Sequence, residues 1–221
     1  MTDNQLTLRK PRILVGATGS VATIKLDLLC QQLSVFAEVI EYLCDNDEWQ
    51  SWQKRGDPVL HIELRKWADI FLIAPLDANT LSKFAHGLCD NLLTSVFRAW
   101  DFSNSHKIVI LAPAMNTYMW DNPLTSKCLE KLQKQFKYSK IHIIWPISKQ
   151  LMCKDVGVGA MEEVPKIVQA VHSQWQKCLK DNDNNNDIDT KTTAMRASQI
   201  RILVASLVLF SFCCISLRNK R

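Results

Sequence analysis

A turn rich in glycine and hydroxyl groups follows a short apolar run near the start of the chain. The run is Arg12–Val15, and the turn reads Gly16-Ala-Thr18-Gly19-Ser20. Backbone N–H groups, hydroxyls and the start of the next helix would meet here, as a phosphate monoester requires. Thr18 replaces a glycine of the dinucleotide fingerprint, so we expect a mononucleotide such as FMN at Gly16, Gly19 and Ser20. A purely structural turn, with Ser20 as a helix N-cap, explains the same residues.

Two more loops of this kind follow apolar runs. The runs Ala68–Ala74 and Lys107–Ala112 are near-continuous in apolar residues, as in strands buried on both faces. The loops that follow them are Pro75–Thr80 and Pro113–Thr117. Because parallel strands end at a common edge of the sheet, we expect all three loops to form one ligand site.

The apolar periodicity predicts further elements between these runs. Helical spacing begins at Val21, Ala78–Trp100 reads as one or two helices, Ile141–Trp145 as a strand and Glu163–Leu179 as a closing helix. The alternation predicts an α/β fold with a doubly wound, mostly parallel sheet of the Rossmann or flavodoxin-like kind and helices on both faces.

Composition limits the function classes. The chain has 221 residues, 47% of them hydrophobic, and a net charge of +5, with Lys and Arg spread along it, so we expect one core and no nucleic-acid binding. Its eight cysteines lack the paired spacing of a disulfide framework or a metal site. We therefore expect no metal. The polar N-terminus shows no leader sequence, so we expect a cytoplasmic protein.

Four sequence blocks carry a family resemblance. They are GATGSVA (Gly16–Ala22), DPVLHIELRKWAD (Asp57–Asp69), APLDANTLSKFAHGLCDNLLT (Ala74–Thr94) and APAMNTYMW (Ala112–Trp120). In this order they resemble the homo-oligomeric flavin-containing cysteine decarboxylases. The motifs HIELRKWAD and CDNLLT resemble those of the phosphopantothenoylcysteine branch of this family. A further block, LMCKDVGVGAM (Leu151–Met161), resembles the substrate clamp of the family.

The resemblance implies a lyase of coenzyme A biosynthesis. It implies FMN-dependent decarboxylation of 4'-phosphopantothenoylcysteine to 4'-phosphopantetheine through a thioaldehyde and an enethiolate, with the flavin as electron sink. It also implies a homotrimer with active sites between subunits. A non-catalytic subunit of the same fold that regulates a protein phosphatase is the alternative, and retention of His61 and Cys153 argues against it.

Three residues match the catalytic positions of the family. By this resemblance His61 acts as base or orients the substrate, Asn116 holds the substrate carboxylate, and Cys153 returns a proton. Each residue also has a purely structural explanation. His61 could be a buried residue at the end of a strand, Asn116 a turn residue, and Cys153 a small apolar side chain. A cysteine-hydrolase triad of these three would leave the phosphate turn unexplained.

Weaker matches complete the expected site. The resemblance places Asp77, Ala78, Asn79, Thr80 and Ala114 against the flavin. The residues expected on the clamp over the substrate are Gln150, Met152 and Met161.

Two departures from the family concern the sheet edge and the clamp. The stretch Ser34–Asp45 is too short for the strand, loop and helix that lie there in the family, so we expect a shortened edge strand within Ala37–Leu43. Lys154 replaces a glycine after Cys153, and Gln150 replaces a basic residue. We expect a looser clamp or a lower pKa of the Cys153 thiol.

The ends of the chain differ in composition from its body. We expect a flexible N-terminus at 1–11, the flavoprotein domain at 12–180, a disordered Asn/Asp-rich linker at 181–199 and an apolar tail at 200–221. Ile202–Leu217 has 16 uncharged residues, short of the roughly 20 that span a bilayer. The tail is expected either to tether the protein to a membrane or to pack on a partner.

Overall fold

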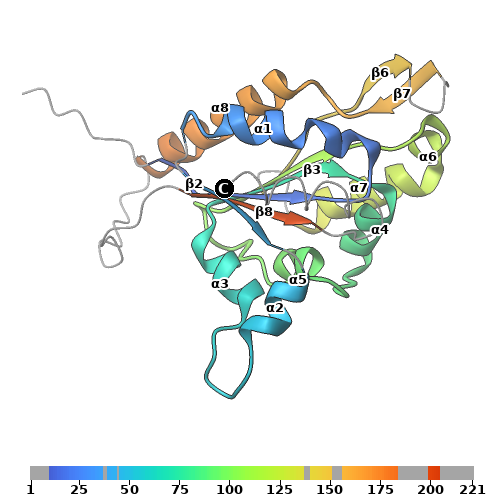
Figure 1. Cartoon of the computed structure of the whole chain (residues 1–221). Coiled ribbons are helices and arrows are strands. Elements are labelled where there is room, and N and C mark those ends of the chain that lie inside the picture. Colours follow the sequence, from blue (N-terminus) through green and yellow to red (C-terminus); the bar gives the residue numbers. More distant parts are fainter. Residues whose placement is uncertain are drawn as a thin grey trace, which may run out of the picture.

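Six parallel strands form one sheet with helices on both faces (Figure 1). The computed structural model describes residues 10–36, 39–43, 45–136, 140–150, 156–183 and 199–204. Across the sheet the strands are β2 (Val39–Leu43), β8 (Gln199–Val204), β1 (Ile13–Ala17), β3 (Ile70–Leu76), β4 (Ile108–Pro113) and β5 (Ile141–Ile143). Every neighbouring pair is parallel, which confirms the predicted α/β class.

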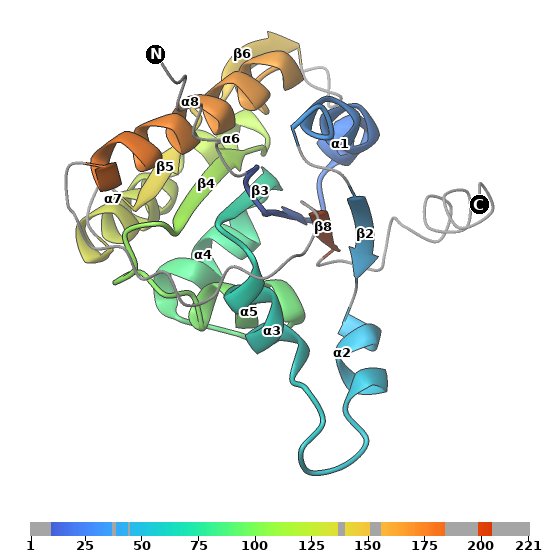
Figure 2. The ribbon, with the colours of Figure 1, turned by 90° about the vertical axis from the view of Figure 1, so that its left-hand side faces the viewer.

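Two helical layers cover the sheet, as the edge-on view of Figure 2 shows. One layer holds η1 (Val21–Lys25), α1 (Leu26–Leu33) and α8 (Val164–Asp183), and the other holds α3 (Leu60–Trp67), α4 (Ala78–His86), α5 (Leu92–Arg98) and α7 (Pro123–Gln135). Alternate strand residues face opposite layers: Ile13 and Val15 pack towards α1 and α8, whereas Leu14 packs towards α3 and α5. Each of these buried side chains contributes about 1.5–3 kcal/mol of transfer free energy.

Smaller elements lie at the periphery. These are α2 (Asp45–Ser51), α6 (Thr117–Asp121) and an antiparallel hairpin of β6 (Ile147–Gln150) and β7 (Val156–Ala160). The predicted helical region 78–100 is two helices. Gly87, with a φ of 73°, ends α4 in the left-handed conformation, and a capping box between Asn91 and Thr94 begins α5.

The segment around His61 is a helix, whereas the structural explanation of His61 placed it at the end of a strand. It forms α3, where Leu60, Leu64 and Trp67 recur at helical spacing and pack into the core. The buried ammonium of Lys107 donates to the carbonyl oxygens of Arg65 (2.6 Å) and Ala68, which fixes the C-terminal end of α3. Desolvation lowers the pKa of Lys107 to about 8.

The C-terminal region also departs from the expected boundaries. Helix α8 continues to Asp183, past the expected domain end at 180, and residues 199–204 form β8 inside the sheet. The short edge strand exists as β2, yet it pairs with β8 instead of β1. The first residues of the expected 200–221 tail therefore belong to the fold. Residues 205–221 lie outside the described part.

Among the described residues, no helix combines the length and apolar character that crossing a membrane requires.

Candidate functional site

Thr18 joins the first two loops at the carboxyl edge of the sheet. Its backbone N–H and its hydroxyl donate to the carbonyl oxygen of Pro75, at 3.1 and 3.0 Å, and its Oγ1 accepts from the N–H of Asp77 at 2.7 Å. The side chain is 2% exposed, so these bonds are shielded from water. Two of the expected loops, Gly16–Ser20 and Pro75–Thr80, therefore lie side by side as predicted.

The first glycine of the Gly16–Ser20 turn is required by the packing around it. A Cβ on Gly16 would lie 2.8 Å from Leu93 Cδ1, so glycine here lets α5 approach β1 closely. Ser20 is the N-cap of η1, and its Oγ accepts from Ala22 N at 3.3 Å. Gly19 is exposed. The cap explanation of Ser20 is thus correct, while Gly19 and Ser20 still lie at the surface of the edge.

The second loop opens directly into α4. Asp77 is its N-cap, with Oδ1 accepting from Thr80 N at 2.7 Å, and Thr80 is buried. Ala78 and Asn79 form the first turn, and Asn79 is exposed. The buried Ala114 donates its N–H to Leu76 O at 2.8 Å, which brings the third loop to the same edge.

Asn116 is both a helix cap and an open donor. Its Oδ1 accepts from Met119 N at 2.8 Å and so begins α6. The residue is exposed, and within the described chain its NH₂ group donates to no acceptor. That group can make two hydrogen bonds to a carboxylate. The turn explanation and the substrate-binding role of Asn116 are therefore compatible.

Two glycines missed by the sequence reasoning let the β6–β7 hairpin lie against the third loop. Met115 N donates to Gly159 O at 2.9 Å, and a Cβ on Gly159 would overlap Met115 O. A Cβ on Gly157 would lie 2.5 Å from Thr117 Oγ1. The alternating glycines of Val-Gly-Val-Gly were the available signal, since glycine inside a strand often marks close backbone approach.

Glu163 links this hairpin to η1, the helix that follows the Gly16–Ser20 turn. Its carboxylate accepts from Lys25 at the end of η1 (2.9 Å) and from Lys149 on β6 (3.2 Å). Hydrogen bonding to Lys25, and then to Lys149, lowers the pKa of Glu163 below its usual value of 4.5.

The remaining expected residues are placed unevenly. Gln150 ends β6, and Met152, Cys153 and Lys154 lie outside the described residues. Met161 is 3% exposed and packs in the core with Val164, which differs from the expected place on a clamp over substrate. Its flexible apolar side chain gains more from burial than from exposure.

Within the described part of one chain, His61 and Asn116 lie far from each other. It lies on α3, whereas Asn116 begins α6, and the two helices lie well apart in both Figure 1 and Figure 2.

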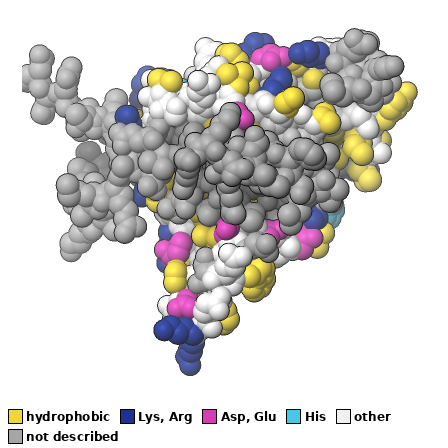
Figure 3. All heavy atoms as spheres, viewed as in Figure 1, with side chains coloured by type: hydrophobic (Ala, Val, Ile, Leu, Met, Phe, Trp, Pro, Cys, Tyr) yellow, Lys and Arg dark blue, Asp and Glu magenta, His cyan; other side chains and the backbone are white. Residues whose placement is uncertain are grey.

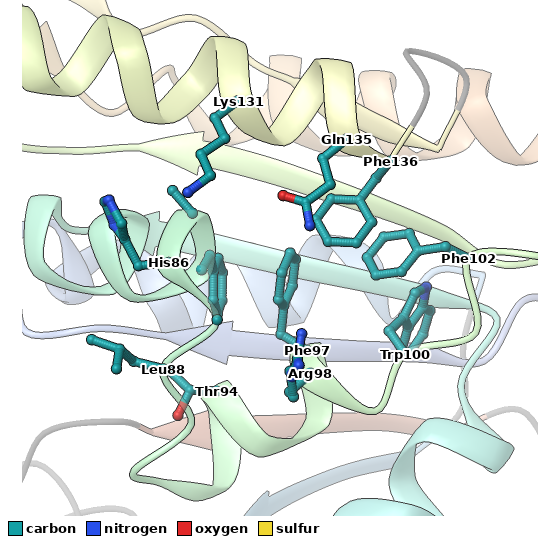
Figure 4. A pocket seen from close by; sticks show the side chains of 13 residues that line it. His86, Leu88, Thr94, Phe97, Arg98, Trp100, Phe102, Lys131, Gln135 and Phe136 are labelled. Atoms are coloured by element: carbon teal, nitrogen blue, oxygen red, sulfur yellow. The ribbon is translucent and has the colours of Figure 1, made fainter.

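A separate hollow of about 390 Å³ lies between α4, α5 and α7 (Figure 4). Its walls are aromatic rings that pack on one another, with Phe84 on Phe97 at 3.8 Å and Phe102 on Phe136 at 4.1 Å between centroids. Its lining includes none of the residues expected to bind the flavin or the substrate. We therefore assign the candidate site to the sheet edge.

Replacing Gly159 by alanine should displace the hairpin. Gly159 has a φ of 147° and no room for a Cβ, so we expect a loss of about 1–3 kcal/mol in unfolding free energy, measured by denaturant titration. Gly56→Ala is the matched control, because Gly56 has a φ of 103° and open space around it. Equal losses in the two variants would contradict the close approach at Met115.

Glu163 predicts a pH dependence of stability. Because its pKa is lowered on folding, its contribution is complete above the usual value of 4.5 and is lost as the pH falls through the lowered folded pKa. Water screens the half-exposed pair, so the contribution is below about 1 kcal/mol. The unfolding free energies of the wild type and Glu163→Gln should converge at low pH. Glu130→Gln, at another surface pair, controls for general charge effects, and an unchanged gap at low pH would refute the assignment.

Comparison with known proteins gives one consistent group. The family described as Flavoprotein matches residues 1–176. A probable phosphopantothenoylcysteine decarboxylase of Arabidopsis thaliana is 49% identical over 188 residues, 76% of this chain and 90% of that protein. The phosphopantothenoylcysteine decarboxylase of Mus musculus is 49% identical over 189 residues, 75% and 89% of the two chains.

Solved structures agree with the sequence relatives. A PPC decarboxylase mutant complexed with pantothenoylaminoethenethiol superposes with a TM-score of 0.71 at 46% identity, over 76% of this chain and all of that one. The FMN binding protein AtHal3 gives a TM-score of 0.68 at 47% identity, over 76% and 98%. Since the family match extends over residues 1–176, which is well over half of the sequence, this chain belongs to the flavoprotein family.

Proposed function

We propose that this chain is an FMN-dependent decarboxylase that converts 4'-phosphopantothenoylcysteine to 4'-phosphopantetheine in coenzyme A biosynthesis. The observation that carries the proposal is the exposed Asn116 amide, which begins α6 at the edge where the phosphate turn and the Asp77 loop meet. Relatives at 49% identity bear the name of this enzyme, and a structure at 46% identity holds pantothenoylaminoethenethiol.

The residues present at the edge fit a flavin mononucleotide. Gly19 and Ser20 offer an exposed backbone and a hydroxyl at the start of η1, where a phosphate is favoured. Beside them lie the first turn of α4, with the exposed Asn79, and the small side chain of Ala114. Gly16, Gly19 and Ser20 would hold the phosphate, and Asp77–Thr80 and Ala114 would line the rest. Bound there, FMN supplies a two-electron sink.

Asn116 would hold the substrate carboxylate with neutral donors. A lysine or arginine at this place would stabilise the charged carboxylate more than the departing neutral carbon dioxide, and so raise the barrier. An amide orients the group at a smaller cost. The imidazole ring of His61 would take up a proton from the substrate. Cys153, beyond the described residues, would return one.

We also propose that the site is completed by a second copy of the chain in a homotrimer. His61 and Asn116 lie on helices far apart in one chain, and contact between copies would bring them together. Exposed apolar side chains gather over α6 and β7, at the right of Figure 3. On these two elements they are Tyr118, Met119 and Val158. Such a group is typical of an interface.

Replacing Asn116 by aspartate should separate its two roles. Aspartate keeps the N-cap but loses both donors and adds a negative charge, so we expect near-normal stability and a fall in kcat/KM of about 100-fold or more. Carbon dioxide release and thermal unfolding measure the two effects. Asn122→Asp is the control, since Asn122 caps α7 in the same way. A fully active Asn116→Asp enzyme would contradict the substrate role.

Mixed subunits should test the shared site. His61→Ala and Asn116→Asp are each expected to be inactive alone. If each site takes these residues from different copies, unfolding and refolding the two variants together should restore activity in about a quarter of the sites. Refolding each variant alone is the control. A mixture that stays inactive, although it assembles, would place both residues in the same subunit.

A further inference from the structure

The strand next to β1 comes from the far end of the chain. β8 pairs in parallel with β1 from Ile13↔Ile200 to Ala17↔Val204, and on its other side with β2 from Val39↔Gln199 to Leu43↔Leu203. Among the described strands, β2 meets the sheet only through β8. This strand is therefore interior, although it is last in sequence.

The strand lies outside the part of the chain that the family accounts for. The family match ends at residue 176, before the end of α8, whereas β8 begins at Gln199. Residues 184–198, which join them, can span up to about 50 Å. The part of the chain shared with the family therefore does not include the strand that pairs with β1 on this side.

The register places the end of β8 beside the phosphate turn. Val204 is opposite Ala17, and Thr18, which clamps the turn to Pro75 and Asp77, is the next residue. With β2 in its present place, loss of β8 would leave one edge of β1 with unpaired N–H and C=O groups over the whole strand. The position of the turn would then depend on β3 alone.

The sequence of β8 suits an interior position. Ile200, Ile202, Leu203 and Val204 are residues that favour buried parallel strands. In the register Arg201 is the Cα partner of Glu41 on β2, so two residue types of opposite charge are at matching positions of neighbouring strands. The same register would be disfavoured by two like charges.

We propose that residues 199–204 are a positioning strand for the cofactor turn, so that this chain holds its cofactor only with its C-terminal strand inserted between β1 and β2. The identity of that cofactor as FMN rests on the proposed function. The strand itself does not, and the two are tested separately.

Hydrogen exchange of the full-length protein tests the insertion directly. We expect the amides of 200–204 to be protected to the same degree as those of 13–17, and added FMN to slow the exchange of both segments, because the coupling of two sites is reciprocal. Exchange of 200–204 at the rate of an unstructured peptide would overturn the proposal. If no flavin binds while 200–204 remains protected, the proposed function fails and the inserted strand stands.

Proline substitution tests the dependence of the cofactor on the strand. Ile202→Pro removes a backbone donor from an interior strand, and we expect at least a 10-fold weaker retention of FMN, with Ile202→Val retaining it as the wild type does. Equal retention by the proline variant would overturn the proposal.

A charge exchange covers the case in which the proline variant does not fold. Glu41→Arg should weaken FMN retention and lower the melting temperature, and adding Arg201→Glu should restore both. Failure of the second change to restore either would overturn the register.

Discussion

The position at which β1 ends governs the candidate site. Backbone pairing on both sides of β1, with β3 and with β8, fixes the last residue of the strand, and the buried hydroxyl of Thr18 then fastens the following turn to the end of β3. A parallel strand that loses one neighbour can shift or fray, because its unpaired backbone N–H and C=O groups then form hydrogen bonds with water. In the proposed account, the position of Gly19 and Ser20 therefore depends on a strand from the other end of the sequence.

Local signals in the sequence were sufficient for the strands and loops that form the edge. β3 and β4 are continuous apolar runs closed by proline, and such runs have few alternatives to a buried parallel strand. The role of residues 199–204 could not be seen in this way. An apolar segment that follows a polar linker has the same composition whether it enters a membrane or a sheet. Only the three-dimensional structure, in which β8 lies between β1 and β2, distinguishes the two cases. His61 was read on a two-residue period, although Leu60, Leu64 and Trp67 carried the helical one. Cys153 and Met152 stay predictions.

Several residues at the edge do two things at once. Asn116 begins a helix with its oxygen and leaves its NH₂ group outward, and Ser20 caps η1 beside the exposed Gly19. Capping fixes the side-chain rotamer, so a group held in this way loses little further entropy when it binds a ligand. Gly157 and Gly159 allow the β6–β7 hairpin to lie against the loop that carries Asn116, because a Cβ at either position would overlap that loop. Among the described site residues, His61 lies far from Asn116 in a single chain.

The central claim, that this sheet edge is a flavin site used for decarboxylation, is tested most directly by the absorbance spectrum of the purified full-length chain followed by addition of 4'-phosphopantothenoylcysteine. The full chain is required because a protein ending at residue 180 would lack β8. The account predicts a flavin spectrum that co-elutes with the protein in near-stoichiometric amount, and release of carbon dioxide from the added substrate. Folded, colourless protein that takes up no added FMN would contradict it.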